Sequence, residues 1–425
     1  MINLHVKSLK TISRLWDAGH AISADSDRLI ESSFTNNMRI LFLDQSGKPG
    51  GAELCLLDIA KHYRSNCLVG LLADGSFREL LEQQQIPVEI LTRQPIQVQK
   101  ESGLRQGLKS IGQLIPLMRR VARLACEFDV IYANTQKALV VVVIASLFSK
   151  RSLVYHLHDI VSADHFSAIN RHIIITLANR FASLVIANSQ ATQAAFVAAG
   201  GRQELTTVVY NGFQAEQYQP SATERSQLRQ TLALNDHFVI GHFSRLSPWK
   251  GQHLLLHALA QCPETVTAVF VGDALFGEEE YVQHLHRLVD QLKLQERVTF
   301  LGFRSDIPQL MAACDLVAHT SIAPEPFGRV IVEGMLCGTP VIAAAAGGAM
   351  EIIEHGKTGW LVPPGDTCKL AATIHHCYQN QADMVAIAHH AQQVARDRFN
   401  LLVTNQQIDH LLQQIHAPRL KECVS

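Results

Sequence analysis

The chain reads Glu-Pro-Phe-Gly-Arg-Val-Ile-Val-Glu at residues 325–333, and Gly-Met-Leu-Cys-Gly-Thr-Pro-Val-Ile follows at residues 334–342. The first nine residues predict a loop that passes into a helix at Gly328. One carboxylate, Glu325, then lies on the loop and a second, Glu333, on the helix. The next nine residues predict a helix stop followed by a short apolar strand.

The same alternation of strand and helix runs through most of the chain. Short apolar segments are separated by stretches that predict helices, which is typical of a parallel sheet covered on both faces. The first series of predicted strands comprises residues 38–43, 67–72, 87–91, 129–133, 152–157, 183–187 and 206–210. The second series comprises residues 238–243, 266–271, 298–301, 315–319, 339–343 and 359–362.

Two series of this kind predict an α/β protein with two tandem Rossmann-like, doubly wound domains that face each other across a cleft. We place the domains at residues 38–212 and 213–400. Residues 1–37 form a polar leader, which we expect to be flexible or accessory, and residues 401–425 a C-terminal helical segment. Ligands of doubly wound sheets bind at the carboxyl ends of the strands, so functional residues are expected at those ends.

Composition argues against several classes of function. The 425 residues carry a net charge of −1, with a pI of about 7.1, so no basic excess indicates a nucleic-acid partner. The nine cysteines include no Cys-x-x-Cys pair, so neither a zinc site nor a disulfide framework is predicted, and scattered thiols fit a reducing cytosol. The leader lacks the apolar core of a secretory signal.

Two cations follow the first strand of the second series. Arg245 and Lys250 lie between the strand at 238–243 and the helix expected from Gln252. Arg by bidentate hydrogen bonds and Lys as a point charge can neutralise a diphosphate. The alternative is a pair of solvated loop cations. An anion is also expected at the helix that Gly328 opens, because free N–H groups and the positive dipole end meet there. Together these features indicate a nucleotide-sugar site.

Two further strands of this series break on glycine. Gly272 would let a ligand approach the backbone, and the loop at 302–304, with Phe303 at its centre, could offer backbone groups to a base edge. A plain turn is the alternative at each position.

In the first series, Gly50 and Gly51 lead from a strand into a helix and permit close approach of a phosphate or sugar, although a flexible turn is the alternative. The segment is neither a dinucleotide-binding fingerprint nor a Walker loop. His156 and His158 share a face of the strand at 152–157, and His158 lies nearer its carboxyl end. His158 is therefore the functional candidate, with a structural role as the alternative. We predict no metal site, because no compact cluster of histidine and carboxylate appears.

A basic segment lies at residues 101–128. Its cations stand among leucines and isoleucines, a pattern that suits either a helix on an anionic membrane or, more often, a helix packed on the sheet with a solvated basic face. The cations are Arg105, Lys109, Arg119, Arg120 and Arg123.

Together these segments resemble the group-1 (family 4) retaining glycosyltransferases of the GT-B fold, over about residues 39–399. The resemblance depends on the Glu-x7-Glu pattern, on the two cations after a strand, on Gly-Gly-Ala-Glu at 50–53 and on His-Asp at 158–159. It implies that residues 38–212 form the acceptor-side domain and that residues 213–400 bind the nucleotide-sugar donor. It also implies that the C-terminal helix crosses back to the first domain.

The resemblance implies a role for each matching residue. Glu333 would hydrogen-bond the ribose hydroxyls, and Glu325 the hydroxyls of the transferred sugar. The catalytic residues would be Arg245, Lys250, Glu325 and His158, the two cations holding the diphosphate. The donor-binding residues would be Glu333, Phe327, Gly328, Arg329, Gly50 and Gly51, to which the strand ends add Gly272 and Phe303. Residues 327–329 would contribute backbone groups, and Gly50, Gly51 and His158 would line the cleft.

The implied activity is the transfer of a hexosyl group from a nucleotide-diphosphate sugar to a hydroxyl of a glycan, a lipid-linked sugar or a small molecule, with retention. Neither a metal ion nor another cofactor is expected. The expected location is cytoplasmic, with peripheral contact to an anionic membrane as a further hypothesis. The alternatives are an epimerase or phosphorylase of the same fold, and a non-catalytic assembly subunit.

Overall fold

The computed structural model describes residues 38–92, 104–146, 151–234, 236–274 and 277–422, without the side chains of residues 104–114 and 417–422. The polar leader at 1–37 lies outside the described residues. In the described ranges no helix is long and apolar enough to cross a membrane.

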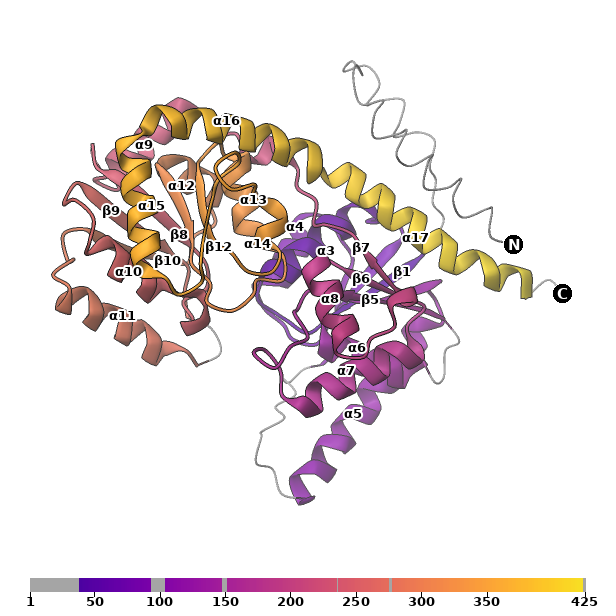
Figure 1. Ribbon diagram of the computed structural model, residues 1–425. Helices are drawn as coiled ribbons and strands as arrows, with labels where there is room; N and C mark the ends of the chain where they lie inside the picture. Colours follow the sequence, from indigo (N-terminus) through magenta and orange to yellow (C-terminus); the bar gives the residue numbers. More distant parts are fainter. Residues whose placement is uncertain (1–37, 93–103, 147–150, 235, 275–276, 423–425) are drawn as a thin grey trace, which may run out of the picture. The chain divides into compact units, whose positions relative to one another are not determined.

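The first sheet has seven parallel strands in the order β3-β2-β1-β4-β5-β6-β7 (Figure 1). Its strands are β1 (Ile40–Asp44), β2 (Cys67–Leu71), β3 (Val88–Ile90), β4 (Val130–Ala133), β5 (Ser152–Leu157), β6 (Leu184–Ala187) and β7 (Thr206–Val208). Its helices are α3 (Gly51–His62), α4 (Ser76–Gln83), α5 (Leu104–Ala125), α6 (Gln136–Ser146), α7 (Ala168–Phe181) and α8 (Gln190–Ala198), with a 3-10 turn, η1 (Gln203–Leu205).

Both faces of the first sheet are covered, which is why its strands read as continuous apolar runs. Every residue of β1 is buried. Leu41 and Leu43 belong to the core that includes residues of α5, α6 and α7. Phe42, between them, points to the opposite face and packs against Tyr63 and Tyr132.

The second sheet has six parallel strands in the order β10-β9-β8-β11-β12-β13. Its strands are β8 (Phe238–Phe243), β9 (Val266–Val271), β10 (Val298–Gly302), β11 (Leu316–His319), β12 (Val341–Ala344) and β13 (Trp360–Val362). Its helices are α9 (Ala222–Thr231), α10 (Gln252–Leu259), α11 (Glu279–Gln291), α12 (Ile307–Ala313), α13 (Arg329–Leu336), α14 (Ala349–Ile352), α15 (Thr367–Gln379) and α16 (Gln381–Arg398), with the 3-10 turns η2 (Ala215–Tyr218) and η3 (Pro248–Lys250).

The second sheet also packs helices on each face. Ile240 of β8 lies in one core with residues of α10, α11 and α15. Its neighbour Val239 lies in a second core with residues of α12, α13 and α16. Alternate residues of one strand therefore serve two cores.

In each sheet the strand order reverses once, between β1 and β4 and between β8 and β11. Connections leave opposite faces at such a point, and this opens a crevice at the carboxyl ends of the two central strands. The predicted α/β fold with two doubly wound sheets is confirmed, and each predicted strand is found within one or two residues of its expected ends.

The last helix, α17 (Leu401–Glu422), contacts the first sheet's layer of helices. Asp409 accepts hydrogen bonds from the ring of His62 at 2.8 Å and from the hydroxyl of Tyr63, both at the end of α3. Farther along, the carbonyl of Ile415 accepts from Ser152 on β5 at 3.3 Å. We retain the division at residues 212 and 400 as a proposal.

Candidate functional site

A buried ion pair stands where the strand order of the second sheet reverses. Lys250, in η3 after β8, places Nζ 2.7 and 3.0 Å from the two carboxylate oxygens of Glu325, which follows β11. The two side chains are only 15% and 12% exposed. The ammonium of Lys250 also lies 4.0 Å from the ring centre of Trp249. Two residues that are 75 positions apart are thus brought together by the switch point.

Glu325 receives two further hydrogen bonds. His319 Nε2, at the end of β11, lies 3.0 Å from Oε2, and the hydroxyl of Ser321 donates to the same oxygen at 3.0 Å. Burial by itself would raise the pKa of Glu325, but the charge of Lys250 and the contact with His319 outweigh burial and hold the pKa well below its ordinary value. Glu325 is therefore an ionised, oriented carboxylate.

The backbone around Lys250 is fixed by a glycine. Gly251 has φ = 71°, and a Cβ there would lie 2.1 Å from the carbonyl oxygen of Thr320. The hydroxyl of Thr320 donates to the carbonyls of Lys250 and Gly251 at 3.0 and 2.9 Å. The turn after β8 is therefore locked against the end of β11.

Arg245, just beyond β8, pairs with a carboxylate that the sequence did not indicate. Its Nε lies 3.3 Å from Oε2 of Glu278, and Ser247 donates to the other oxygen at 2.5 Å. Gly272 supports this loop, since a Cβ there would lie 2.0 Å from the carbonyl oxygen of Ser244. Packing alone accounts for Gly272, and its contact with a ligand stays a prediction.

At the start of α13, Gly328 has φ = 101° and occupies the N-cap position. A left-handed backbone suits glycine there. The next side chain, Arg329, is buried between two carboxylates: it lies 3.5 Å from Asp58 of α3 and 3.4 Å from Glu333 one turn along its own helix. Its guanidinium also sits 4.5 Å from the ring centre of Phe213. From the sequence, Arg329 was predicted to contribute only its backbone, and Asp58 was not predicted as a partner.

Glu333 lies on the same helix, and its carboxylate faces Arg329. Tyr218 donates to its Oε1 at 3.4 Å, a long contact. Burial raises the pKa of Glu333, while Arg329 acts in the opposite direction. Its predicted contact with ribose hydroxyls stays a prediction.

The two aromatic candidates differ in exposure. Phe327 is 2% exposed and packs against Phe213 and Phe399, with ring centres 6.3 and 5.7 Å apart, so its side chain belongs to the core and only its backbone can meet a ligand. Phe303, at the end of β10, is 68% exposed. An exposed aromatic ring at a strand's carboxyl end is able to stack on a base.

The first sheet contributes a hydrogen-bonded chain at its own switch point. The amide nitrogen of Asn134, which follows β4, donates to Asp44 at 2.7 Å and to the carbonyl of Ala52 at 3.1 Å. The amide oxygen of Asn134 therefore faces His158, whose Nε2 lies 2.9 Å away and must carry the proton. Burial, assisted by the charge of Arg329, lowers the pKa of His158 to about 3, so the ring is neutral with a free lone pair on Nδ1.

Gly50 and Gly51 lie at the other side of this switch point. Gly50 caps α3, and its N–H donates to Glu53 at 3.0 Å. A Cβ on Gly51 would lie 3.6 Å from Cδ of Arg329. Gly51 thus lies beside the buried side chain of Arg329, and contact of either glycine with a ligand stays a prediction.

Loops of the first sheet contact the segment that carries Glu325. His165 Nε2 lies 3.3 Å from the carbonyl of Pro324, and its ring packs edge-on against Trp249. The hydroxyls of Ser189 and Thr192 donate to the carbonyl of Pro326. The backbone on each side of Glu325 is held from the loops after β5 and β6.

One group of side chains could hold a metal ion, although the sequence shows no metal-ligand spacing. Sγ of Cys55 and one ring nitrogen each of His156 and His158 lie within 4.8 Å of one another. The residues come from α3 and from the end of β5. They become neighbours only when the helix packs on the sheet.

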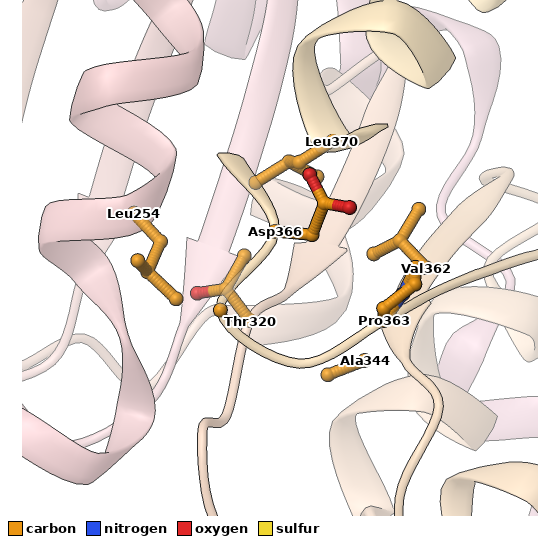
Figure 2. A pocket seen from close by; sticks show the side chains of 8 residues that line it. Leu254, Thr320, Ala344, Val362, Pro363, Asp366 and Leu370 are labelled. Carbon is orange, nitrogen blue, oxygen red and sulfur yellow. The ribbon is translucent and has the colours of Figure 1, made fainter. Parts of the chain in front are cut away.

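A small hollow lies close to the site without belonging to it (Figure 2). Its volume is about 210 Å³ including the part open to solvent, and its walls are mainly apolar. Two polar side chains line the hollow, Thr320 and Asp366. The hydroxyl of Thr320 donates to the turn after β8, and the carboxylate of Asp366 accepts from the N–H of Lys369 as the cap of α15. Its polar groups are therefore satisfied within the chain, and we assign it no ligand.

Residues Leu104–Ala125 of the basic segment form the helix α5, and the side chains of Arg105 and Lys109 lie outside the described part. Arg120 pairs with Glu89 at 2.7 Å and also donates to the carbonyl of Leu91. Arg119 and Arg123 are exposed. One cation is thus used within the fold, and membrane contact stays a prediction.

A buried histidine beside the site gives a prediction on pH. His242 of β8 places Nε2 3.0 Å from the hydroxyl of Thr320, and burial, assisted by His319 and Lys250, lowers its pKa from 6.5 to about 3. An unfolded chain binds a proton at this position near pH 5 that the folded chain does not. The stability that neutral His242 supports is therefore lost as the pH falls from 6.5 towards 3.

We expect the substitution His242→Gln to remove this dependence. Between pH 7 and pH 5 the free energy of unfolding of the variant should improve relative to that of the native protein by about 2 kcal/mol, at about 1.4 kcal/mol per pH unit below 6.5. Urea denaturation at the two pH values measures the difference. A constant difference would contradict the buried, neutral state of His242.

Both halves of the chain match families of known proteins. The profile of the glycosyl transferases group 1 matches residues 224–394, and that of glycosyltransferase family 4 matches residues 49–217. Among curated proteins, the chain is 37% identical over 170 residues to spore coat protein SA of Bacillus subtilis, covering 37% of this chain and 45% of that protein. It is 36% identical over 178 residues to D-inositol 3-phosphate glycosyltransferase of Mycobacterium marinum, covering 41% and 37%. The chain thus spans less than half the length of these two relatives.

Among solved structures, Anabaena Alr3699/HepE in complex with UDP-glucose is 60% identical, with a TM-score of 0.84, covering 89% of this chain and 100% of that chain. The same protein has been solved with UDP and glucose. Sucrose-phosphate synthase from Thermosynechococcus elongatus is 20% identical, with a TM-score of 0.76 over 90% and 100% of the two chains, a likeness of fold alone.

Proposed function

Because the chain belongs to the group-1 glycosyltransferases of family 4, we propose that it transfers a glucosyl group from UDP-glucose to an acceptor hydroxyl, with retention of anomeric configuration. UDP-glucose is the ligand of the Anabaena protein, which is 60% identical over its full length. The observation that carries the proposal is the buried pair of Lys250 and Glu325 at the switch point of the second sheet. It provides a fixed cation and a fixed carboxylate at the edge where doubly wound sheets bind nucleotides.

In the proposed reaction the glycosidic bond of the donor breaks and negative charge grows on the leaving diphosphate. Lys250 and Arg245 stabilise this charge, Lys250 from a position fixed by Glu325 and Arg245 from one fixed by Glu278. The first N–H groups of α13, after Gly328, offer a further site for a phosphate.

We assign no protein nucleophile. Glu325 is ionised, but Lys250, His319 and Ser321 all bond to its carboxylate, so its oxygens are committed to holding the cation and to meeting hydroxyls of the sugar. Attack by the acceptor on the face that the diphosphate leaves, with the leaving phosphate taking the acceptor's proton, gives retention without such a nucleophile. His158 offers a lone pair on Nδ1 that can accept a hydrogen bond from a sugar hydroxyl.

Donor selectivity is the first test. We expect UDP-glucose and UDP to raise the melting temperature, and GDP-glucose and ADP-glucose to have little effect at equal concentration. Ligand at one hundred times its Kd stabilises the folded state by about 2.7 kcal/mol. Differential scanning fluorimetry measures this, with glucose alone as the control. Equal responses to all three nucleotides would contradict a uridine-specific site.

Stereochemistry and metal dependence form the second test. We expect proton NMR of the glucosylated product to show an α-linkage, since the donor is the α-anomer, and we expect EDTA to leave the initial rate of UDP release unchanged. A β-linked product would overturn retention without affecting the donor assignment. A rate that EDTA abolishes and Mg²⁺ restores would overturn the metal-independent reaction.

The acceptor is assigned only by class, as a hydroxyl of a glycan, a lipid-linked sugar or a small molecule met by the first sheet's loops, which carry the variable contacts of such enzymes. A cytoplasmic location with peripheral binding to anionic membrane through α5 is part of the proposal. Liposome flotation with and without anionic lipid tests that part, and absence of binding to both would contradict it. An epimerase, a phosphorylase or an assembly subunit is not favoured, because both family profiles describe transferases.

A further inference from the structure

Three side chains of types that can ligate a metal ion lie together on α3 and at the end of β5. Cys55, in the second turn of α3, is 3% exposed, and His156, near the end of β5, is 2% exposed. His158 is the first residue after β5 and is half-buried. Their ligand atoms lie within 4.8 Å of one another. The ligand atoms of one tetrahedral zinc ion, with bonds of about 2.0–2.3 Å, stand roughly 3.5 Å apart, so a small contraction would close the group around an ion.

The hydrogen bonds around the two rings engage one nitrogen of each ring and leave the other with its lone pair. Because Asn134 presents its amide oxygen to Nε2 of His158, that nitrogen carries the proton and Nδ1 keeps its lone pair. In His156, Nδ1 lies 2.8 Å from the hydroxyl oxygen of Tyr132. Its Nε2 is buried without a hydrogen-bond partner among the residues that the structure describes. Histidine ligands of metals ordinarily bond through their other ring nitrogen to an oxygen of the protein, as both rings do here.

An ordinary core explains part of this arrangement. Sγ of Cys55 lies 3.2 Å from the amide oxygen of Asn211, and the rings of His156 and His158 pack with their centres 3.9 Å apart. Packing does not satisfy Nε2 of His156, and a polar atom left without a partner in a core lowers stability. A ligand that accepts the lone pair of that nitrogen would remove this cost.

We propose that Cys55, His156 and His158 bind a thiophilic divalent cation of the Zn²⁺ class, and that the bound ion inhibits the transferase by immobilising His158. One thiolate and two imidazoles favour zinc over magnesium or calcium, which prefer oxygen ligands. On binding, the thiol of Cys55 releases its proton to solvent and each ring donates one lone pair. The fourth position of the ion is left to water, on the side of the half-buried His158.

The inhibitory part rests on the proposed function, because it assigns His158 to the site where sugar is transferred. The bound ion occupies Nδ1 of His158, the lone pair that the proposed reaction leaves for a sugar hydroxyl. The bound ion therefore acts as an inhibitor, and the reaction itself still needs no metal. Binding and inhibition are separate observations and can fail separately.

The experiment uses the full-length protein freed of metal by EDTA and dialysis. We expect Co²⁺, the spectroscopic substitute for Zn²⁺, to give a thiolate charge-transfer band, and isothermal titration with Zn²⁺ to find one site more in the native protein than in the Cys55→Ser variant. Serine keeps a hydroxyl for Asn211 but ligates zinc poorly. The matched control is Cys67→Ser, because Cys67 is also a buried cysteine of this domain but lies outside the group.

In assays of UDP release, Zn²⁺ should inhibit the native protein and Cys67→Ser, and the concentration for half-inhibition should rise at least about tenfold in Cys55→Ser, which corresponds to 1.4 kcal/mol. A charge-transfer band that survives in Cys55→Ser, or the absence of the additional site, would overturn the metal site. Binding of Zn²⁺ without inhibition would overturn the inhibitory role of the ion. Inactivity with every donor would count against the proposed function, while the titration would still report on the site.

Discussion

Replacing Lys250 with methionine should lower kcat by about 10²–10³-fold, because it removes the fixed charge that stabilises the leaving diphosphate. Methionine keeps the length of the side chain but removes the contact of the ammonium with the ring of Trp249. The acceptor is not in contact with Lys250 in the proposed reaction, so its KM should change less than kcat does. Steady-state UDP release at saturating donor measures both constants.

The control for this substitution is Lys357→Met. Lys357 also pairs with a glutamate, Glu354, but both side chains are more than 60% exposed. Breaking an exposed pair of this kind lowers the free energy of unfolding far less than breaking a buried one. Lys250→Met also leaves Glu325 with one donor fewer. The double variant Lys250→Met, Glu325→Gln removes both charges, so it should regain stability without regaining turnover. Normal kcat in Lys250→Met would refute the assignment of this site.

Replacing Arg329 with leucine should lower the free energy of unfolding by about 3–5 kcal/mol, because it leaves two buried carboxylates without their cation. Asp58 and Glu333 are 17% and 13% exposed, so water cannot replace the guanidinium fully. Burial already raises the pKa of both carboxyls, and Arg329 opposes that rise. Without Arg329 both pKa values rise further.

A carboxyl with a raised pKa in the folded state supports stability below its unfolded pKa, and that stability is lost as the pH rises through the folded pKa. The decrease in the free energy of unfolding caused by Arg329→Leu should therefore be greater at pH 8 than at pH 5. Urea denaturation at both values measures it. Adding Asp58→Asn should restore part of the loss. The exposed pair of Arg202 and Glu204 supplies the control, since Arg202→Leu should cost less than about 1 kcal/mol. Equal losses in the two arginine variants would contradict the buried triad.

Strand periodicity and strand ends accounted for much of the site. Lys250 was predicted because it follows an apolar strand, and Glu325 because it opens the Glu-x7-Glu pattern. Parallel strands bring their carboxyl ends to one edge, where the two residues meet. His319 also ends an apolar strand, β11, six residues before Glu325, but it was not among the predicted site residues. Its strand-end position was the signal that could have identified it.

Other partners carried no such signal. Glu278 faces Arg245 from the segment that leads into α11, and Asp58 faces Arg329 from the middle of α3. Neither stands at the end of a strand. Phe327 shows the converse, since its motif position suggested a ligand contact while the aromatic core of the second domain buries its side chain.

The sequence by itself determined the two series of parallel strands and the residue types that collect at the strand ends, because side-chain period and loop composition are local properties of the chain. Only the tertiary structure decided that Asp58 meets Arg329, 271 residues away, and that Cys55 of one helix reaches His156 of one strand. Such contacts depend on how a helix face packs against a sheet, which many sequences satisfy with apolar residues alone. The ionised state of Glu325 and the neutral state of His158 follow from that burial and those neighbours.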